Sequence, residues 1–361
     1  MPLVLREGYE AMAEAAVHAG CRFFAGYPML PFTGLLDAFT RAFERQGDGV
    51  MIQADTEIEG INMALGAAAT GARAATGSTG QGIALMQEAV AEAALNELPL
   101  VIFNIGRGQQ DYFQCTRGGG WGDYHTIALS PASVTEADEL TRLAFDLADK
   151  WLTPVIVYGD HLIGFTQMTV EHDPDRPPVV QPDKPWALDG STGGTGTSKV
   201  IWTWRQGKHN TPGPGPNVHW QQVADKYAEI EQAEPRHVAG HVAGARHLVV
   251  SFGTTGPFVD YVVDELRGDG HAVGSFRPVT LWPFPAAALA EAVAECDQVL
   301  VYELNAGQMV DDVRLALNGA VPVRSIGGVS QDESGMRQGE LLGVDVMRAR
   351  ILDAMQGVDA P

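Results

Sequence analysis

Short apolar runs alternate along the chain with longer stretches in which apolar residues recur every three or four positions. The short runs predict buried strands at 22–27, 50–53, 98–105 and 154–158. The longer stretches predict helices at 7–19, 32–43 and 134–151. This alternation indicates a mostly parallel sheet covered on both faces. Because ligands bind such sheets beyond the carboxyl ends of the strands, we expect a site in the loops after Tyr27, Thr76 and Asn104.

The same alternation returns after residue 246, with apolar runs at 247–252, 271–276, 298–303 and 321–323. Residues 171–245 differ, because they are rich in proline and glycine and carry only one polar helical stretch, 222–234. We therefore predict an α/β domain at 1–170, a linker with a short helix at 171–245 and a smaller α/β domain at 246–361. Four tryptophans predict an anchored linker: Trp186, Trp202, Trp204 and Trp220.

The stretch 53–86 is the most informative part of the chain. Asp55 and Thr56 are typical helix N-cap residues, and the helix that follows them has an apolar face of Ile58, Ile61, Leu65 and Ala68. A strand of small residues at 72–76 leads into the glycine-rich turn 77–82, which lets the backbone approach a ligand before a second helix begins. On pattern alone, the favoured interpretation is an ordinary one, in which Glu57 decorates a helix start and residues 77–82 form a simple turn.

Composition limits the functional classes. The 361 residues are 45% apolar, as in a soluble globular protein, and no apolar run is long enough to span a membrane. No basic segment followed by an apolar core opens the chain, so we expect a cytoplasmic protein. A net charge of −21 argues against a nucleic-acid partner.

The cysteines and histidines predict no metal site in this chain. The three cysteines, Cys21, Cys115 and Cys296, are far apart and form no C-x-x-C motif, so we expect buried structural thiols and neither an iron–sulfur cluster nor a structural zinc. The scattered histidines are expected to be surface or capping residues: His209, His219, His237, His241 and His247.

A second informative stretch is the loop 106–124, which is long for an α/β connection. It combines Arg107 and Arg117 with aromatic residues and several glycines. Pattern alone leaves two interpretations open, a functional loop or a flexible surface excursion.

Several motifs resemble those of the 2-oxoacid:ferredoxin oxidoreductases. Thr56-Glu57, the G-A-A-x-G-A-R string at 66–73 and the L-M-Q-E string at 85–88 are similar to that family's pyrimidine-binding domain. The D-Y-F-Q string at 111–114 and the G-G-G-x-G-D-Y string at 118–124 resemble the α subunit of branched-chain 2-oxoisovalerate:ferredoxin oxidoreductases. Residues 276–285 and 303–314 are similar to the family's second domain, which is like the C-terminal domain of transketolases.

The resemblance implies roles for individual residues. Glu57 would be the catalytic glutamate that hydrogen-bonds the aminopyrimidine ring of thiamine diphosphate. The other implied cofactor contacts are Tyr27, Pro28, Thr79, Gly80 and Gln81. Arg107 and Leu30 would contact the substrate, although the family usually has a threonine where this chain has Leu30. The segment after Arg107 is also shorter than in the family, so the substrate need not be a simple 2-oxo acid.

The resemblance also implies partners. The cofactor would be shared with a β subunit that holds the diphosphate, Mg²⁺ and an iron–sulfur cluster, because this chain has no G-D-G motif with the following Asn. Further γ/δ or ferredoxin-like subunits, ferredoxin and coenzyme A are the other implied partners. Two alternatives remain open: a thiamine-dependent non-oxidative decarboxylase or carboligase on the same scaffold, and a non-catalytic scaffold subunit, against which the presence of Glu57 argues.

Overall fold

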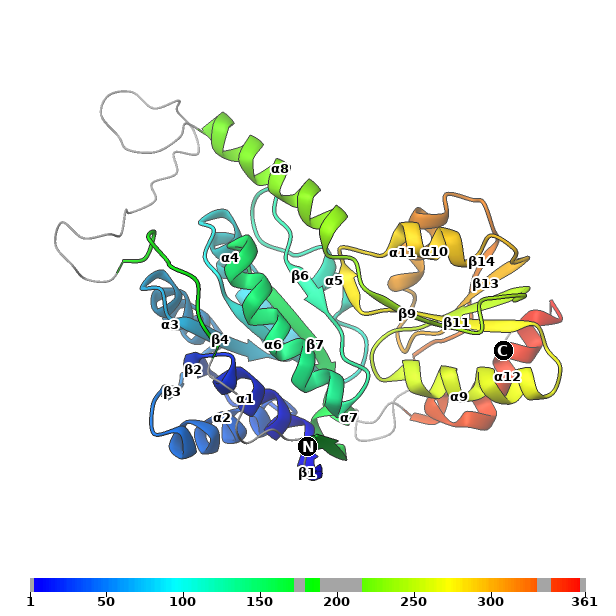
Figure 1. Cartoon of the computed structure of the whole chain (residues 1–361), viewed down its shortest axis with the longest axis horizontal. Coiled ribbons are helices and arrows are strands. Elements are labelled where there is room, and N and C mark those ends of the chain that lie inside the picture. Colours follow the sequence, from blue (N-terminus) through cyan, green and yellow to red (C-terminus); the bar gives the residue numbers. More distant parts are fainter. Residues whose placement is uncertain (1–2, 172–178, 189–215, 330–338, 358–361) are drawn as a thin grey trace.

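A computed structural model describes residues 3–171, 179–188, 216–329 and 339–357, which form two α/β units side by side (Figure 1). The alternating strands and helices predicted from the sequence are present in both units. The division of the chain into domains at residues 170 and 246 stays a prediction. Trp202, Trp204 and His209 lie outside the described residues.

The first unit is built on a seven-stranded sheet. Its strands lie in the order β12 (Thr280–Trp282), β6 (Ile127–Leu129), β7 (Val155–Asp160), β5 (Val101–Gly106), β4 (Arg73–Ser78), β2 (Cys21–Gly26) and β3 (Val50–Gln53). All neighbours are parallel except β12, which pairs antiparallel with β6. The sequence analysis did not predict β12, and the structure shows that a strand from the second half of the chain completes the edge of the first sheet.

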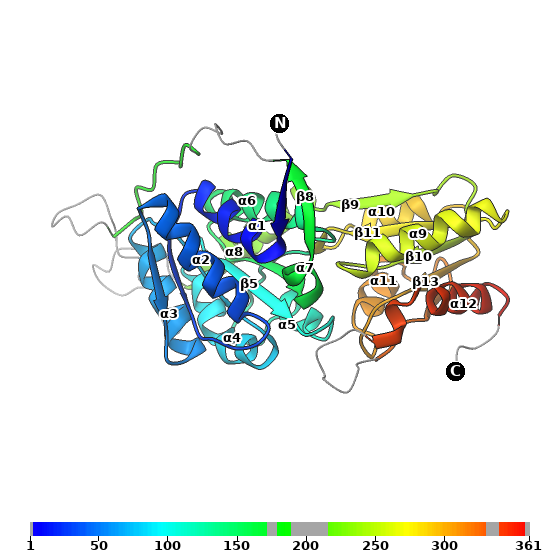
Figure 2. The same cartoon turned by 90° about the horizontal axis from the view of Figure 1, so that it is seen from below.

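Helices cover both faces of this sheet, as the sequence predicts (Figure 2). One layer contains α1 (Gly8–His18), α2 (Thr33–Gln46) and α6 (Val134–Trp151). The opposite layer contains α3 (Glu57–Ala69) and α4 (Gly80–Leu95). The central strands β4, β5 and β7 are buried along their whole length. Beside this unit, β1 (Leu3–Glu7) and β8 (Gln167–Glu171) form an antiparallel pair, and α7 (His161–Phe165) follows β7.

The second unit has a five-stranded sheet. Its order is β14 (Val323–Ser325), β13 (Gln298–Val301), β10 (His247–Val250), β11 (Val273–Pro278) and β9 (His237–Gly240), and only β9 runs antiparallel to its neighbour. The helices pack in pairs, α9 (Thr255–Gly268) with α12 (Val344–Met355) and α10 (Ala286–Ala292) with α11 (Met309–Leu317). A 3₁₀ turn at Gly339–Leu342 precedes α12.

Helix α8 (Pro216–Ala233) crosses the edge of the first sheet near β6 and β12 (Figure 1). Tyr227 of this helix packs edge-on against Trp282, whose ring stacks on His125 with centroids 4.4 Å apart. Trp220 lies edge-on to Trp121, so this tryptophan is anchored as predicted. The prediction for His219 was wrong, because its side chain is buried beneath the same helix.

The inward face of α3 also differs from the prediction. Ile61 and Ala68 are buried, but Ile58 is 49% exposed. The buried face begins at Glu57 and continues through Ile61 and Ala64. The sequence analysis placed Ile58 on the buried face of α3, whereas the structure buries the neighbouring Glu57. The buried face of α3 therefore begins with Glu57 rather than with Ile58.

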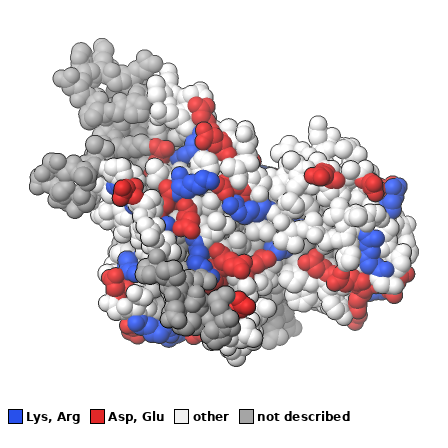
Figure 3. All heavy atoms as spheres, in the orientation of Figure 1, with Lys and Arg blue, Asp and Glu red and all other residues white. Residues whose placement is uncertain are grey.

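Charged side chains of both signs are interspersed over the face of the molecule in Figure 3. Several charged side chains of the chain form ion pairs, for example Lys150 with Glu234 at 2.6 Å, and the buried Arg73 with Asp149 at 2.8 Å. Among the helices of the described residues, none combines the length and apolar character that crossing a membrane would require.

Candidate active site

The carboxyl ends of β2, β4 and β5 lie next to one another. Gly26 is the register partner of Gly77, and Ser78 is the register partner of Asn104. The loops that the sequence analysis singled out therefore leave the same edge of the sheet. This edge carries Glu57 at the start of α3, the turn before α4 and Arg107 after β5.

Glu57 is the first residue of α3, and its side chain is only 4% exposed. The preceding Thr56 caps the helix, because its Oγ1 accepts a hydrogen bond from Glu59 N–H at 3.2 Å. Ser78, at the end of β4, donates its hydroxyl to Glu57 Oε1 at 3.2 Å. Within the described residues this is the only hydrogen bond to the Glu57 carboxylate, so one carboxylate oxygen is held while the other can still accept a proton or a hydrogen bond.

Gly82 explains how a carboxylate fits against the first turn of α4. A Cβ at this position would overlap both Ser78 Oγ and Glu57 Oε1. Glycine is therefore required here by close approach rather than by backbone conformation. The glycine-rich turn brings α4 against the buried acid, which is a more specific role than an ordinary turn.

Arg107 lies beside the start of α4. Its Nη1 donates a hydrogen bond to Gln81 Oε1 at 2.8 Å, and it forms no ion pair within the described part of the chain. An open cavity of about 490 Å³ adjoins the guanidinium. It is lined by Thr79, Gly80, Gln81, Ala84, Arg107, Gln110, Asp111 and Gln114. Thr79 is fully buried, and no described residue hydrogen-bonds its Oγ1.

Asp111 fixes the beginning of α4. Its Oδ2 accepts a hydrogen bond from Gly80 N–H at 3.1 Å, and its own N–H donates to the Tyr158 hydroxyl oxygen at 3.1 Å. Burial raises the pKa of the Asp111 carboxyl, while the hydrogen bonds from Gly80 and Asn104 and the charge of Arg107 oppose that rise. The sequence analysis matched Asp111 to a family motif but assigned it no role.

The turn after β2 contributes less directly. Tyr27 and Pro28 are half-buried, and Leu30 is 58% exposed. The hydroxyl of Tyr9 donates to Pro31 O at 2.8 Å and holds this turn against α1. Of the described residues around the cavity, none comes from this turn, so the structure does not bring Leu30 to the group around Arg107.

The loop 106–124 is not a flexible excursion. It contains α5 (Tyr112–Thr116), and Gln109 and Tyr112 are buried against the second unit. Gln109 donates to Phe252 O at 2.7 Å and accepts from Leu304 N–H at 2.8 Å. The loop therefore supplies Arg107 to the cavity and at the same time joins the two units.

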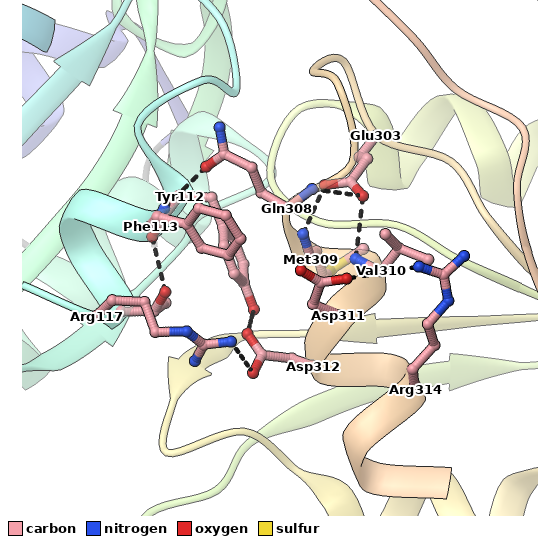
Figure 4. A network of polar contacts seen from close by, with 11 residues as sticks. Tyr112, Phe113, Arg117, Glu303, Gln308, Met309, Val310, Asp311, Asp312 and Arg314 are labelled. Atoms are coloured by element: carbon pink, nitrogen blue, oxygen red, sulfur yellow. Dashed lines mark hydrogen bonds and ion pairs between the residues drawn. The ribbon is translucent and has the colours of Figure 1, made fainter. Parts of the chain in front are cut away.

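Further polar contacts at this junction involve the start of α11 (Figure 4). The Tyr112 hydroxyl donates to Asp312 Oδ2 at 2.6 Å, and Arg117 pairs with Asp312 Oδ1 at 2.7 Å. Phe113 N–H donates to Gln308 Oε1 at 2.9 Å. Glu303 is fully buried and accepts hydrogen bonds from the backbone N–H groups that open α11, while burial raises the pKa of its carboxyl.

Two of the three cysteines are buried, as predicted. Burial raises the pKa of the Cys21 thiol to about 12 and also raises that of Cys115, so neither is a reactive thiolate at neutral pH. Asn104 donates to Cys115 Sγ at 3.3 Å. Within the described residues, no three His, Cys, Asp or Glu side chains are grouped so that they could hold a metal ion.

Comparison with known proteins agrees with this geometry. Residues 14–187 match the domain family described as "Pyruvate flavodoxin/ferredoxin oxidoreductase, thiamine diP-bdg", and residues 245–338 match "Pyruvate:ferredoxin oxidoreductase core domain II". The ketoisovalerate oxidoreductase subunit VorB of Methanothermobacter marburgensis is 35% identical over 329 residues, which cover 86% of this chain and 88% of the relative. The chain belongs to the 2-oxoacid:ferredoxin oxidoreductase family. The resemblance seen in the sequence is thereby confirmed.

Other members of the 2-oxoacid:ferredoxin oxidoreductase family are similarly related. The 2-oxoglutarate synthase subunit KorA of Methanocaldococcus jannaschii is 32% identical, and the match covers 91% of this chain and 96% of the relative. These relatives are named as subunits, which indicates heteromeric enzymes. The match at 14–187 means that this oxidoreductase subunit carries a thiamine diphosphate-binding domain.

Solved structures show the same fold. The 2-oxoglutarate:ferredoxin oxidoreductase of Magnetococcus marinus superposes with a TM-score of 0.83 at 24% identity, and the match covers 98% of this chain. This chain spans 65% of that longer one. A split-gene transketolase superposes with a TM-score of 0.60 at 12% identity over 97% of both chains. The predicted fold class, a pyrimidine-binding domain with a transketolase C-terminal-like domain, is confirmed.

Proposed function

We propose that this chain is the α subunit of a thiamine diphosphate-dependent 2-oxoacid:ferredoxin oxidoreductase. The enzyme would oxidatively decarboxylate a 2-oxo acid to an acyl-coenzyme A and pass the electrons to ferredoxin. The observation that carries this proposal is the burial of Glu57, held by Ser78 at the same sheet edge that carries Arg107. VorB and KorA, named for ketoisovalerate and 2-oxoglutarate, support a 2-oxo acid as the substrate.

The residues at this edge fit the pyrimidine end of the cofactor. Glu57 offers a buried carboxylate oxygen, the fully buried Thr79 has an Oγ1 that no described residue hydrogen-bonds, and the glycines of the turn allow close approach. In this proposal Glu57 holds the aminopyrimidine ring, and the remaining cofactor contacts come from Tyr27, Pro28, Thr79 and Gly80. When bound, thiamine diphosphate supplies the electron sink that decarboxylation of a 2-oxo acid requires.

Glu57 and Arg107 have separate tasks in this account. The carboxylate of Glu57 accepts and returns a proton at the cofactor ring, and burial keeps water from competing for it. The Arg107 guanidinium binds the substrate carboxylate, for which its planar donor fork is suited. Leu30 does not line the cavity beside Arg107, so in this proposal it would contact only a part of the substrate that extends beyond that cavity.

A partner β subunit would complete the active site. It would hold the diphosphate, Mg²⁺ and an iron–sulfur cluster, since this chain has only three widely spaced cysteines. The helices that frame Glu57 support a partner on this side, because Ile58 of α3 and Leu85 of α4 are 49% and 55% exposed. Large exposed apolar side chains beside a site are typical of interaction surfaces.

The test is the substitution Glu57→Gln in the complex purified with its partner. Because the amide cannot exchange the proton, we expect 2-oxo acid-dependent reduction of a viologen dye to fall by roughly 10²–10⁴-fold. Circular dichroism should show an unchanged fold. The control is Glu59→Gln, which changes an exposed acid of the same helix turn and keeps an oxygen for Asp55 N–H.

Turnover of the Glu57→Gln complex at the native rate would refute the proposed role of Glu57. Release of carbon dioxide from the native complex without any electron acceptor would instead support a non-oxidative decarboxylase on the same scaffold. The non-oxidative alternative is tested because this chain has Leu30 where the family usually has a threonine.

A further inference from the structure

Gln81 is the only described residue that hydrogen-bonds the Arg107 side chain. From the 2.8 Å contact between Arg107 Nη1 and Gln81 Oε1, we propose that Gln81 is a positioning residue, which orients the guanidinium for the carboxylate of a 2-oxo acid. This inference rests on the proposed function and deepens it. It gives Gln81 a task at the substrate, whereas the sequence analysis assigned it to the cofactor.

A neutral side chain is suited to this task. A guanidinium has five N–H donors, so one hydrogen bond to an amide oxygen leaves the remaining donors of the fork for a carboxylate. An acidic side chain at the same place would neutralise the charge and compete with the substrate. Asp111 is the nearby acid, but it forms no ion pair with Arg107, and its Oδ2 accepts from Gly80 N–H. The positive charge of Arg107 therefore remains available to a ligand.

The backbone at the start of α4, from which the Gln81 side chain projects, is held in place by a hydrogen bond. Gly80 has a φ of +39°, and a Cβ at this position would lie 3.6 Å from Arg107 Nη1, so the backbone passes close to the guanidinium. The Asp111 carboxylate anchors this same residue. A side chain that projects from an anchored helix turn can orient a long flexible arginine and reduce the entropy lost when a ligand binds.

Two further observations point to an anion beside Gln81. The N-terminal end of α4 carries a partial positive charge, which favours a carboxylate, as the hydrogen bond from Gly80 N–H to Asp111 Oδ2 illustrates. Thr79, the N-cap residue, is fully buried and lines the same cavity, and its Oγ1 has no hydrogen-bond partner among the described residues. The Gln81–Arg107 pair thus adjoins other groups that can bind a carboxylate.

The experiment compares Gln81→Met with the native complex loaded with thiamine diphosphate. Methionine keeps the length of the side chain and removes the oxygen. We measure kcat and KM for the 2-oxo acid and, by calorimetry, the Kd of oxamate, an unreactive carboxylate analogue. The Kd of thiamine diphosphate is measured on the same complexes before the cofactor is added. Because a hydrogen bond to a charged group is lost, KM and the oxamate Kd should rise about tenfold. Neither kcat nor the Kd of thiamine diphosphate should change appreciably.

A second variant and a control sharpen the result. Gln81→Glu should weaken oxamate binding more than Gln81→Met does, because it neutralises Arg107. Gln221→Met is the matched control, since this exposed glutamine of α8 also bonds a charged side chain, Asp225, but lies outside the cavity.

If Gln81→Met left the Kd of oxamate unchanged, the inference would be overturned. It would also be overturned if the substitution changed the Kd of thiamine diphosphate but not the Kd of oxamate. Absence of oxamate binding to the native complex would overturn it as well. Failure of the proposed function would be seen separately, as a native complex that binds oxamate but reduces no acceptor.

Discussion

At the scale of single residues, the proposed chemistry depends on a carboxylate that the fold removes from water. Glu57 is buried at a helix start, with Ser78 on one carboxylate oxygen and the first turn of α4 packed against it. Burying an acid is costly unless its environment compensates, so the precise fit of these neighbours is part of the site. Gly82 is the neighbour that the sequence alone would have left without a role.

Gly82→Ala tests this fit. The added methyl group overlaps Glu57 Oε1 and Ser78 Oγ and must displace them, so we expect the free energy of unfolding to fall by about 1–3 kcal/mol. Activity of the complex should fall with it, because the carboxylate moves. The measurements are denaturant unfolding of the isolated chain and turnover of the complex.

Gly66→Ala provides the comparison for that variant. Gly66 is exposed in the interior of α3, and a Cβ there meets no atom within 4 Å. Alanine at this position should therefore raise the free energy of unfolding by about 0.5–1 kcal/mol. If both variants changed stability in the same direction, the close approach at Gly82 would not be the cause.

Sequence reasoning placed the loops after Tyr27, Thr76 and Asn104 at one sheet edge, because ligands bind parallel sheets beyond the carboxyl ends of the strands. It could not find the contact between Gln81 and Arg107, since that pair depends on the exact path of the turn before α4. It also placed Ile58 on the buried face of α3, although it predicted Ile61 and Ala68 correctly, because periodicity assigns a polar residue such as Glu57 to the surface.

At the scale of elements, α5 and its loop are the least predictable part of the structure. The glycines and charges of 106–124 suit a mobile loop as well as a structural one. Long-range partners decide between the two, because Gln109 and Tyr112 bind residues about 150 to 200 positions later in the chain. The strand β12 was missed for the same reason, since this strand of three residues is defined only by its pairing with β6 of the other unit.

Tyr112→Phe tests the junction formed by α5. It removes the hydrogen bond to Asp312 at 2.6 Å and leaves the buried carboxylate with Arg117 alone. We expect the free energy of unfolding to fall by about 1–3 kcal/mol, the cost of a buried acceptor that loses its donor. Chemical denaturation, followed by tryptophan fluorescence, gives the value.

The matched control for Tyr112→Phe is Tyr261→Phe. Tyr261 also donates its hydroxyl to a carboxylate, that of Glu265, but it is exposed on α9. Water replaces an exposed hydrogen bond, so this variant should change stability much less. Equal effects of the two substitutions would contradict a structural role for the buried contact.

At the scale of the whole molecule, the two α/β units share more than a linker. A strand of the second half completes the first sheet, the loop that carries Arg107 is buried against the second unit, and Tyr227 of α8 packs on Trp282. The position of Arg107 therefore depends on both units. Meanwhile the helices around Glu57 leave apolar side chains exposed, as expected if another subunit covers them.

The most direct test of the central claim is native mass spectrometry of this chain, co-expressed and purified without oxygen together with the subunit encoded beside it. The account predicts a heteromer that carries thiamine diphosphate, Mg²⁺ and iron–sulfur mass, and that loses the thiamine diphosphate when Glu57 is changed to Ala. A heteromer that binds no thiamine diphosphate even with excess cofactor and Mg²⁺ would contradict it.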